Sequence, residues 1–204
     1  MKLKNSLTTV LIFIIVAFYI VAAYAPTVTW GSLGLQDHLM LINKAVFPDG
    51  QLHGVYAGEW WRIFTVVLTH ASWIHLGFNM LVLFQLGNIV ERYYGKGRYA
   101  ILLLVSLVVS SFAAVQLMPV NQSTVGASGM IFGLFGVMLI SGKHMGIDYR
   151  QLLVWIAINL VITFAVPGIA WQAHIGGLVA GVAIALIFQA IPPRQSRQRR
   201  QSVY

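Results

Sequence analysis

Cysteine is absent from the 204 residues, and only five residues are acidic. The lack of cysteine excludes disulfide bonds, a thiolate nucleophile and a thiolate metal site. Charged residues make up 9% of the chain, whereas a soluble domain has roughly 25%. Because 58% of the residues are hydrophobic and the mean hydropathy is +0.79, the composition predicts a multi-pass membrane protein.

The formal net charge is +8, because thirteen Lys and Arg residues outnumber the five acids. A basic balance of this size also occurs in nucleic-acid-binding proteins, where basic residues alternate with aromatic residues that stack on bases. Here the basic residues stand at the ends of apolar segments and form no such cluster. We therefore attribute the charge to membrane topology and expect no nucleic-acid partner.

Six apolar segments approach the length that crosses the roughly 30 Å hydrocarbon core of a bilayer. The predicted spans are residues 7–25, 74–93, 99–117, 126–140, 152–166 and 171–191. The fold class is therefore an all-α membrane protein, with a single domain over residues 1–204. Ala23-Tyr24-Ala25 resembles a signal-peptide cleavage site, but the apolar run before it is too long and Pro26 would hinder a peptidase, so we expect the first span to be retained.

The distribution of Lys and Arg predicts the orientation of the spans. Six spans put both termini on one side of the membrane, and of the thirteen basic residues all but Lys44 and Arg62 lie on that side, including those of a basic tail, residues 194–204. The positive-inside rule makes this side cytoplasmic. A compact chain of this kind is typical of a bacterial plasma membrane, with the lipid bilayer around it.

The connection between the first two spans, residues 27–68, is long and holds three of the five acids, so we expect it outside the cytoplasm. We refer to it as the outer loop. Near its end stand Trp60, Trp61 and Arg62. Tryptophan favours the headgroup level, and Arg62 is expected to snorkel beside the two indole rings.

Four polar residues stand out inside or at the edge of the spans: His75 and Asn79 in the second, Ser128 in the fourth and His174 in the sixth. Such residues are functional candidates, although an intramembrane serine often bonds its own backbone and a histidine can link two helices. Counted at about 1.5 Å per residue from the cytoplasmic ends, all four lie roughly 20 to 26 Å up. They therefore share one layer, from which Asn159 in the fifth span is excluded at about 10 Å.

The fourth span is short, because about 15 residues make only roughly 22 Å of helix. Its start should lie in a recess below the outer surface, where free N–H groups meet water or protein. Small residues should let the fourth and sixth spans pack closely, namely Gly129, Gly133, Gly136, Gly177 and Gly181.

Close packing of these two spans would bring the hydroxyl of Ser128 within reach of His174 as general base. The helix N-terminus, His75 and Asn79 would then stabilise an oxyanion. No acid shares the layer, so the pattern predicts a dyad and not a triad.

Taken in order, these residues resemble the rhomboid family of intramembrane serine proteases. The matching segments are Trp61-Arg62, His70 with His75 and Asn79, Gly87 with Glu91 and Gly95, Gly126-Ala127-Ser128-Gly129, and Ala173-His174-Ile175-Gly176-Gly177 with Gly181. The resemblance implies a six-transmembrane-helix rhomboid-like bundle with a short, recessed fourth helix. It also implies a serine endopeptidase, without a cofactor, that cleaves transmembrane protein substrates near the extracytoplasmic face.

By the same resemblance, Ser128 would be the nucleophile, His174 the base, and His75 and Asn79 the oxyanion donors. His70 would have a structural or water-retaining role, and Trp61-Arg62 would stabilise the outer loop. Many relatives carry a tyrosine one turn after the serine, where this chain has Phe132. A phenyl ring can stack on His174 but donates no hydrogen bond. Substrates would enter laterally past the fifth span and the Pro167-Gly168 turn.

Three other functions fit parts of the pattern. An inactive relative that binds membrane clients could lose Ser128 or His174, yet both are present. A transporter or channel would need charged groups or broken helices near the midplane, and the polar layer lies toward one face without a carboxylate. A metal site of His70, His75 and His174 would lack a nearby acid and an HExxH motif, so we expect no metal.

Overall fold

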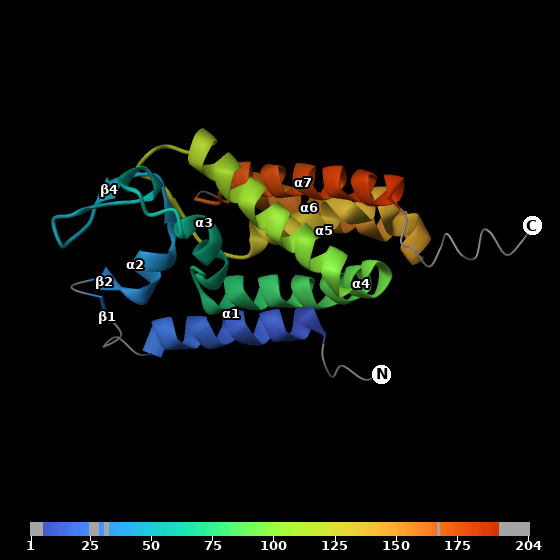
Figure 1. Ribbon diagram of the computed structural model, residues 1–204, viewed down its shortest axis with the longest axis horizontal. Coiled ribbons are helices and arrows are strands. Elements are labelled where there is room, and N and C mark those ends of the chain that lie inside the picture. Colours follow the sequence, from blue (N-terminus) through green and yellow to red (C-terminus); the bar gives the residue numbers. More distant parts are fainter. Residues whose placement is uncertain (1–5, 25–28, 31–32, 167, 192–204) are drawn as a thin grey trace, which may run out of the picture.

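Helices dominate the computed structural model, which describes residues 6–24, 29–30, 33–166 and 168–191. The long helices are α1 (Leu7–Tyr24), α4 (Trp73–Leu117), α5 (Ser128–Ser141), α6 (Tyr149–Ala165) and α7 (Trp171–Ala190). Figure 1 shows them running along one common axis, with α1 beside the first half of α4. Ala25 of the cleavage-like sequence, the following Pro26, Pro167 of the Pro167-Gly168 turn and the basic tail 194–204 lie outside the described residues.

Helix α4 contains two predicted spans, residues 74–93 and 99–117, joined at Gly95. Gly95 has φ 78° and ψ 162°, a combination that interrupts the helix and that only glycine adopts readily. The first arm of α4 runs away from the short strands, and the second arm returns toward them (Figure 1). The chain therefore reverses direction within a few residues, and both arms reach α5.

Four of the helical segments described have the length and hydropathy of a membrane span: α1, α4, α7, and α5 together with the 3-10 turn η3 (Gly142–Met145). Helix α6 is apolar but shorter. It begins at Tyr149, earlier than the predicted Leu152, because the side chain of Asp148 caps it by accepting from the N–H of Arg150. The prediction of a helical membrane protein is thus confirmed.

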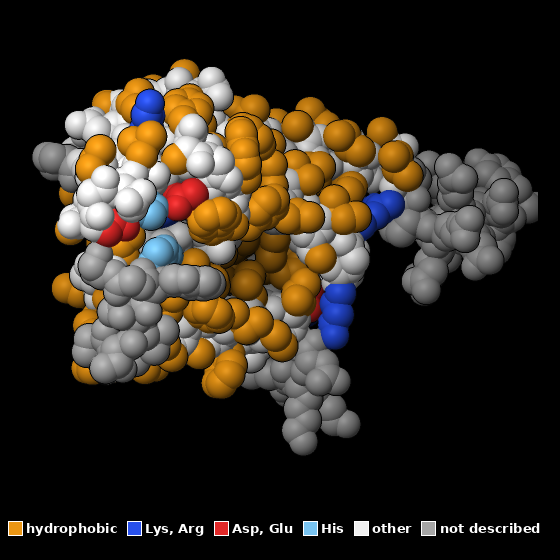
Figure 2. Space-filling model, turned by 60° about the vertical axis from the view of Figure 1, so that its left-hand side comes forward, with side chains coloured by type: hydrophobic (Ala, Val, Ile, Leu, Met, Phe, Trp, Pro, Cys, Tyr) orange, Lys and Arg blue, Asp and Glu red, His pale blue; other side chains and the backbone are white. Residues whose placement is uncertain are grey.

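Polar and apolar side chains separate along the bundle. Figure 2 shows hydrophobic side chains covering the middle of the visible face, with the histidine and most of the visible acidic side chains at one end and most visible Lys and Arg side chains at the other. The exposed hydrophobic residues include Phe13 on α1, Leu104 on α4, Phe164 on α6 and Leu186 on α7. This apolar belt matches the surface that a lipid bilayer covers.

Helix α5 lies at the centre of the bundle, and eleven of its fourteen residues are buried. It packs against α7 backbone to backbone: a Cβ on Gly177 would overlap the carbonyl oxygen of Gly129, and a Cβ on Gly181 would overlap that of Gly133. The close approach predicted from the glycines is therefore confirmed. Ser110 of the second arm of α4 closes the other side, 2.7 Å from the Cβ position of Gly129.

The outer loop lies at the end of the bundle where α4 begins (Figure 1). Its elements are β1 (Thr29–Trp30), β2 (Leu33–Gly34), α2 (Leu35–Leu39), β3 (Leu41–Ile42), β4 (Ala45–Val46), β5 (Leu52–His53), η1 (Val55–Ala57), α3 (Arg62–Thr65) and η2 (Val66–Leu68). Strands β1 and β2 pair antiparallel, as do β4 and β5. Strand β3 pairs antiparallel with β6 (Ser123–Thr124), placing Leu41 opposite Thr124. This ladder ties the outer loop to the segment that leads into α5.

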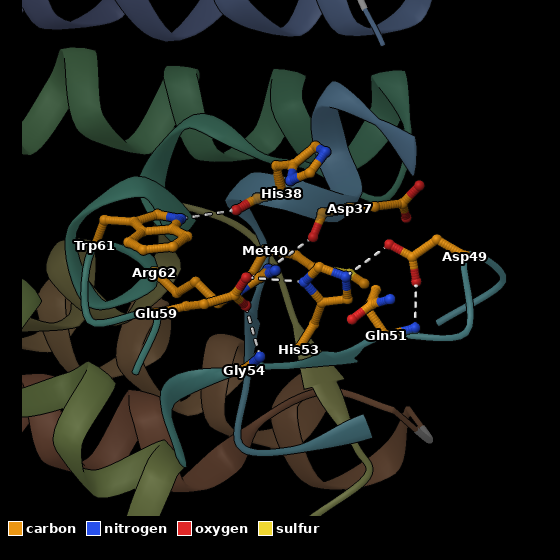
Figure 3. Close-up of polar contacts among 10 residues, drawn as sticks. All are labelled: Asp37, His38, Met40, Asp49, Gln51, His53, Gly54, Glu59, Trp61 and Arg62. Carbon is orange, nitrogen blue, oxygen red and sulfur yellow. Dashed lines mark hydrogen bonds and ion pairs between the residues drawn. The ribbon is translucent and has the colours of Figure 1, made fainter. Parts of the chain in front are cut away.

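The prediction that Arg62 snorkels to the surface is wrong. Its side chain is 0% exposed: Nε donates to Glu59 at 2.6 Å, and Nη1 donates to the carbonyl oxygens of Asp37 (2.6 Å) and Met40 (2.8 Å) (Figure 3). A counter-charge and two carbonyl acceptors inside the loop thus bind Nε and Nη1, while Nη2 is buried without a hydrogen-bond partner among the described residues. Trp61 stays 48% exposed, with its indole N–H on the carbonyl of His38.

Glu59 also joins Arg62 to a histidine that the sequence did not single out. Its Oε1 lies 2.8 Å from Nδ1 of His53, whose Nε2 lies 2.8 Å from Asp49 (Figure 3). The hydrogen bond to Glu59, and then the one to Asp49, raise the pKa of His53 above its usual value against the effect of burial. Burial raises the pKa of Glu59, but hydrogen bonds from His53, Arg62 and Gly54 outweigh it and leave that pKa lowered.

Candidate active site

Ser128 and His174 meet where α5 and α7 begin. The Oγ of Ser128 lies 2.7 Å from Nε2 of His174. Ser128 is half-buried and His174 is buried, since 7% of its surface is exposed. A hydroxyl and an imidazole at this distance form the contact that a general base makes with the nucleophile it activates.

The backbone before Ser128 places its side chain at a helix start. Gly126 has φ 115° and donates its N–H to the carbonyl of Val66 at 3.1 Å. The helix then begins at Ser128, two residues after the predicted start, with Ala127 as its cap. The N–H groups of this first turn have no acceptor within the helix, and the helix dipole adds partial positive charge there.

His75 lies against Gly126. A Cβ at position 126 would stand 2.8 Å from Cε1 and 3.1 Å from Nε2 of this imidazole, so only glycine fits there. The N–H of Ala71 donates to Nδ1 of His75 at 3.3 Å, and the side chain of Ser72 caps α4 at the N–H of His75. With Nδ1 as acceptor, the proton of the neutral ring sits on Nε2, which is thus a donor beside the Ser128 segment.

Asn79 follows His75 by one turn on the first arm of α4. Its side chain is buried, with 7% exposed, and its amide donates one N–H to the carbonyl of His75 at 2.8 Å. A carboxamide carries two N–H hydrogens, and this bond uses one of them. The two residues share a face of α4, as their spacing predicts.

Phe132 stacks on His174. The two ring centroids are 4.3 Å apart and the planes differ by 10°. Phe132 lies one turn after Ser128 on α5 and is itself held edge-on by Phe135. The stacking predicted from the sequence is present, and it limits rotation of the imidazole.

His70 contacts the turn before Ser128. Its side chain is 1% exposed, and Nε2 accepts the N–H of Ala127 at 3.5 Å. The ring contacts those of His75 and Tyr19 at centroid distances of 5.1 and 6.2 Å. These contacts fit the structural role expected for His70. Trp61 and Arg62 make the outer-loop contacts given above.

A small cavity of about 20 Å³ lies beside Ser128 and Gly129, on the side facing α4. Hydroxyl-bearing residues Ser110 and Ser111 and the backbone around Gly126 contribute to its lining. This volume is sufficient for one water molecule, and the lining offers polar partners for it.

One neighbour of His174 was not predicted from the sequence. The hydroxyl of Thr163, on α6, lies 2.7 Å from Nδ1 of His174 and donates to the carbonyl of Asn159. Thr163 stands one turn above Asn159, the residue that the depth count excluded, so continuing the count by four residues would have brought it closer to the polar layer. Both nitrogens of His174 are thus engaged, which opposes a metal site built on this ring.

Comparisons with known proteins agree on one family. A family model described as the rhomboid domain matches residues 57–191. The chain is 40% identical to "Rhomboid protease GluP" of Bacillus subtilis (strain 168) over 129 residues, which is 61% of this chain and 25% of that protein. It is 30% identical to "Putative rhomboid protease YdcA" of the same strain over 191 residues, or 91% of this chain and 94% of that protein. The chain thus spans a quarter of the first relative and nearly all of the second.

Proposed function

Since the chain belongs to the rhomboid family, we propose that it is a serine endopeptidase that cleaves transmembrane segments of other membrane proteins. The observation that carries the proposal is the 2.7 Å contact between Ser128 Oγ and His174 Nε2. It joins a nucleophile and a base in a chain whose relatives are named as proteases.

Acyl transfer follows from this pair. Ser128 Oγ attacks the scissile carbonyl carbon while its proton moves to Nε2 of His174. The imidazolium then protonates the leaving amine as the C–N bond breaks, which leaves an ester on Ser128. Water, deprotonated by the same nitrogen, hydrolyses the ester and restores the hydroxyl.

The oxyanion of each tetrahedral intermediate is stabilised by donors around the start of α5. The first backbone N–H groups of α5 point out of the helix end, and the helix dipole favours negative charge there. His75, whose proton sits on Nε2, and Asn79, with one N–H unused by His75, complete the proposed oxyanion hole.

The membrane topology has six crossings: α1, the two arms of α4, α5, α6 and α7. The first residue of α1 and the last of α7 lie at the same end of the bundle, opposite the outer loop (Figure 1). We place that end in the cytoplasm and the protein in the plasma membrane, following the positive-inside rule. Cleavage then occurs near the extracytoplasmic face.

Helix α5 is recessed in this arrangement. Its fourteen residues span about 21 Å, less than the roughly 30 Å of the hydrocarbon core. Ser128 therefore lies below the outer surface, under the outer loop that β3 and β6 attach to it. Water reaches the ester from that side.

A transmembrane substrate approaches beside α6. Only Leu152, Ile156 and Thr163 are buried on this helix of 17 residues. A cleft of about 450 Å³ opens between the end of α6, the start of α7 and the turn after α4, with Thr163 and Gln172 in its lining. An extended peptide that enters this cleft comes next to His174.

Labelling with a serine-directed fluorophosphonate tests the proposal. Wild type in liposomes should be labelled, and Ser128→Ala and His174→Ala should not. Equal labelling of all three proteins would contradict the assignment of Ser128 and His174 as a catalytic dyad. A wild type without labelling or cleavage would favour the alternative, an inactive relative that binds membrane clients.

A further inference from the structure

His174 makes a hydrogen bond through each ring nitrogen. Nε2 faces Ser128 Oγ and Nδ1 faces Thr163 Oγ1, both at 2.7 Å. A neutral imidazole carries one proton, and it can act as a base toward Ser128 only if that proton sits on Nδ1. The group opposite Nδ1 therefore determines which nitrogen carries the proton, and so whether Nε2 can accept the proton of Ser128.

The hydroxyl of Thr163 has a single proton, and its other contact fixes where that proton points. Thr163 Oγ1 lies 2.7 Å from the carbonyl oxygen of Asn159, which can only accept. The hydroxyl proton is thus directed to Asn159, and Oγ1 is left to accept from Nδ1–H of His174. His174 Nδ1–H thus donates to Thr163, and the hydroxyl of Thr163 donates to a backbone carbonyl of α6.

Thr163 is held in this orientation by its surroundings. It is 3% exposed and lies on the same face of α6 as the other two buried residues of that helix, Leu152 and Ile156. Its branched side chain has few rotamers in a helix, and its hydroxyl commonly bonds the carbonyl four residues earlier. Phe132 fixes the imidazole plane at the same time.

We infer that Thr163 is a positioning residue, whose hydroxyl holds His174 in the Nδ1–H tautomer and so leaves Nε2 free to take the proton of Ser128. A neutral hydroxyl on a neighbouring helix then takes the place that a carboxylate has in a triad. The inference rests on the proposed function. It also makes the base depend on α6, because a shift of that helix away from α7 removes the acceptor of Nδ1–H.

Two substitutions at one position separate the hydroxyl from the shape of the side chain. Thr163→Val keeps the branched shape and removes the acceptor, so fluorophosphonate labelling should slow on the order of tenfold to a hundredfold, as expected when a buried donor loses its partner. Thr163→Ser keeps the hydroxyl and should label within about twofold to threefold of wild type, since only a methyl group is lost. Thr8→Val is the matched control, because it removes a buried hydroxyl between α1 and α4, where Thr8 bonds Glu91 and Tyr99.

Labelling rates are compared at equal amounts of folded protein, judged by thermal unfolding. A Thr163→Val rate equal to wild type, or a Thr163→Ser rate as low as that of Thr163→Val, overturns the inference.

A second measurement does not depend on catalysis. In ¹⁵N NMR spectra of histidine-labelled protein, with His174 assigned by its loss in His174→Ala, wild type should show the proton on Nδ1. Thr163→Val should show a mixture of tautomers. A wild-type proton on Nε2 overturns the inference, even if the variants fail to fold. A wild type that shows the Nδ1–H signal but is never labelled contradicts the proposed function alone.

Discussion

Phe132 lies one turn after Ser128, and its ring stacks on His174 with 4.3 Å between the centroids. Stacked aromatic pairs contribute about 0.5–1.5 kcal/mol, which corresponds to roughly twofold to twelvefold in rate if the contact orients the base. We expect Phe132→Leu to slow fluorophosphonate labelling by that factor. Phe188→Leu, which removes a ring that packs on Tyr94 of α4, is the control. Equal rates in the two variants would show that stacking does not orient the base.

Asn79 is the proposed oxyanion donor whose role is simplest to isolate. Its replacement by alanine should lower turnover by about a hundredfold, the typical effect of losing one such donor. Asn88→Ala removes a side chain with the same type of bond on the same helix, from Nδ2 to the carbonyl four residues earlier, and should leave turnover unchanged. If Asn79→Ala is as active as Asn88→Ala, Asn79 has no part in the mechanism.

At the scale of single residues, the sequence identified the proposed catalytic pair more readily than the residues that contact it. Ser128 and His174 stand out because polar side chains in apolar helices require a reason. Thr163 does not, because a threonine in a membrane helix usually bonds its own backbone, and this one does so as well. His53 was missed because its two carboxylate partners become visible only after β4 and β5 pair.

At the scale of helices, the contact between α5 and α7 leaves no room for a side chain. Gly177→Ala would place a methyl group on the carbonyl of Gly129, so we expect a loss of about 1–3 kcal/mol in the free energy of unfolding, together with slower labelling as Ser128 and His174 separate. Gly77→Ala is the control, because nothing lies within 4 Å of its Cβ position on α4, and better helix propensity should stabilise it slightly. Stability is measured in detergent. An equal loss of stability in both variants would contradict a steric requirement for glycine at position 177.

The length of the apolar runs predicted where the helices lie in the sequence, but it did not predict every residue at which they begin and end. The first span ends at Tyr24 and the last at Ala190, close to prediction, because charged or proline-rich segments flank the apolar runs. The predicted fourth span begins at Gly126, whereas the φ of 115° keeps Gly126 outside the helix, which begins at Ser128. The outer loop could not be predicted, because its short strands pair through backbone groups with little sequence signal.

At the scale of the whole molecule, the outer loop contains the groups through which we expect stability to depend on pH. The pKa of His53 is raised from 6.5, so its contribution to stability is complete below about pH 6.5 and is lost as pH rises through the raised value. The pKa values of Asp49 and Glu59 are lowered from 3.8 and 4.5, so their contributions are lost as pH falls through those lowered values. The outer loop should therefore be most stable between about pH 4.5 and 6.5.

Thermal unfolding of the protein between pH 6 and pH 9 checks this expectation. The midpoint of wild type should fall over this interval, and His53→Gln should remove most of the fall. His144→Gln, in η3 at the cytoplasmic end of the proposed topology, should behave as wild type. A fall of the same size in His53→Gln would show that another group titrates.

The burial of α5 has a consequence for how the surrounding lipid should affect the proposed reaction. Eleven of its fourteen residues contact protein, whereas most of α6 is exposed. Acyl-chain length and lipid type therefore act on α6 and scarcely on the surroundings of Ser128. Labelling by a small fluorophosphonate should vary little between bilayers of different thickness, whereas cleavage of a transmembrane substrate should vary strongly. The proposed reaction at Ser128 should therefore depend little on the lipid, whereas the access of a substrate should depend on it strongly.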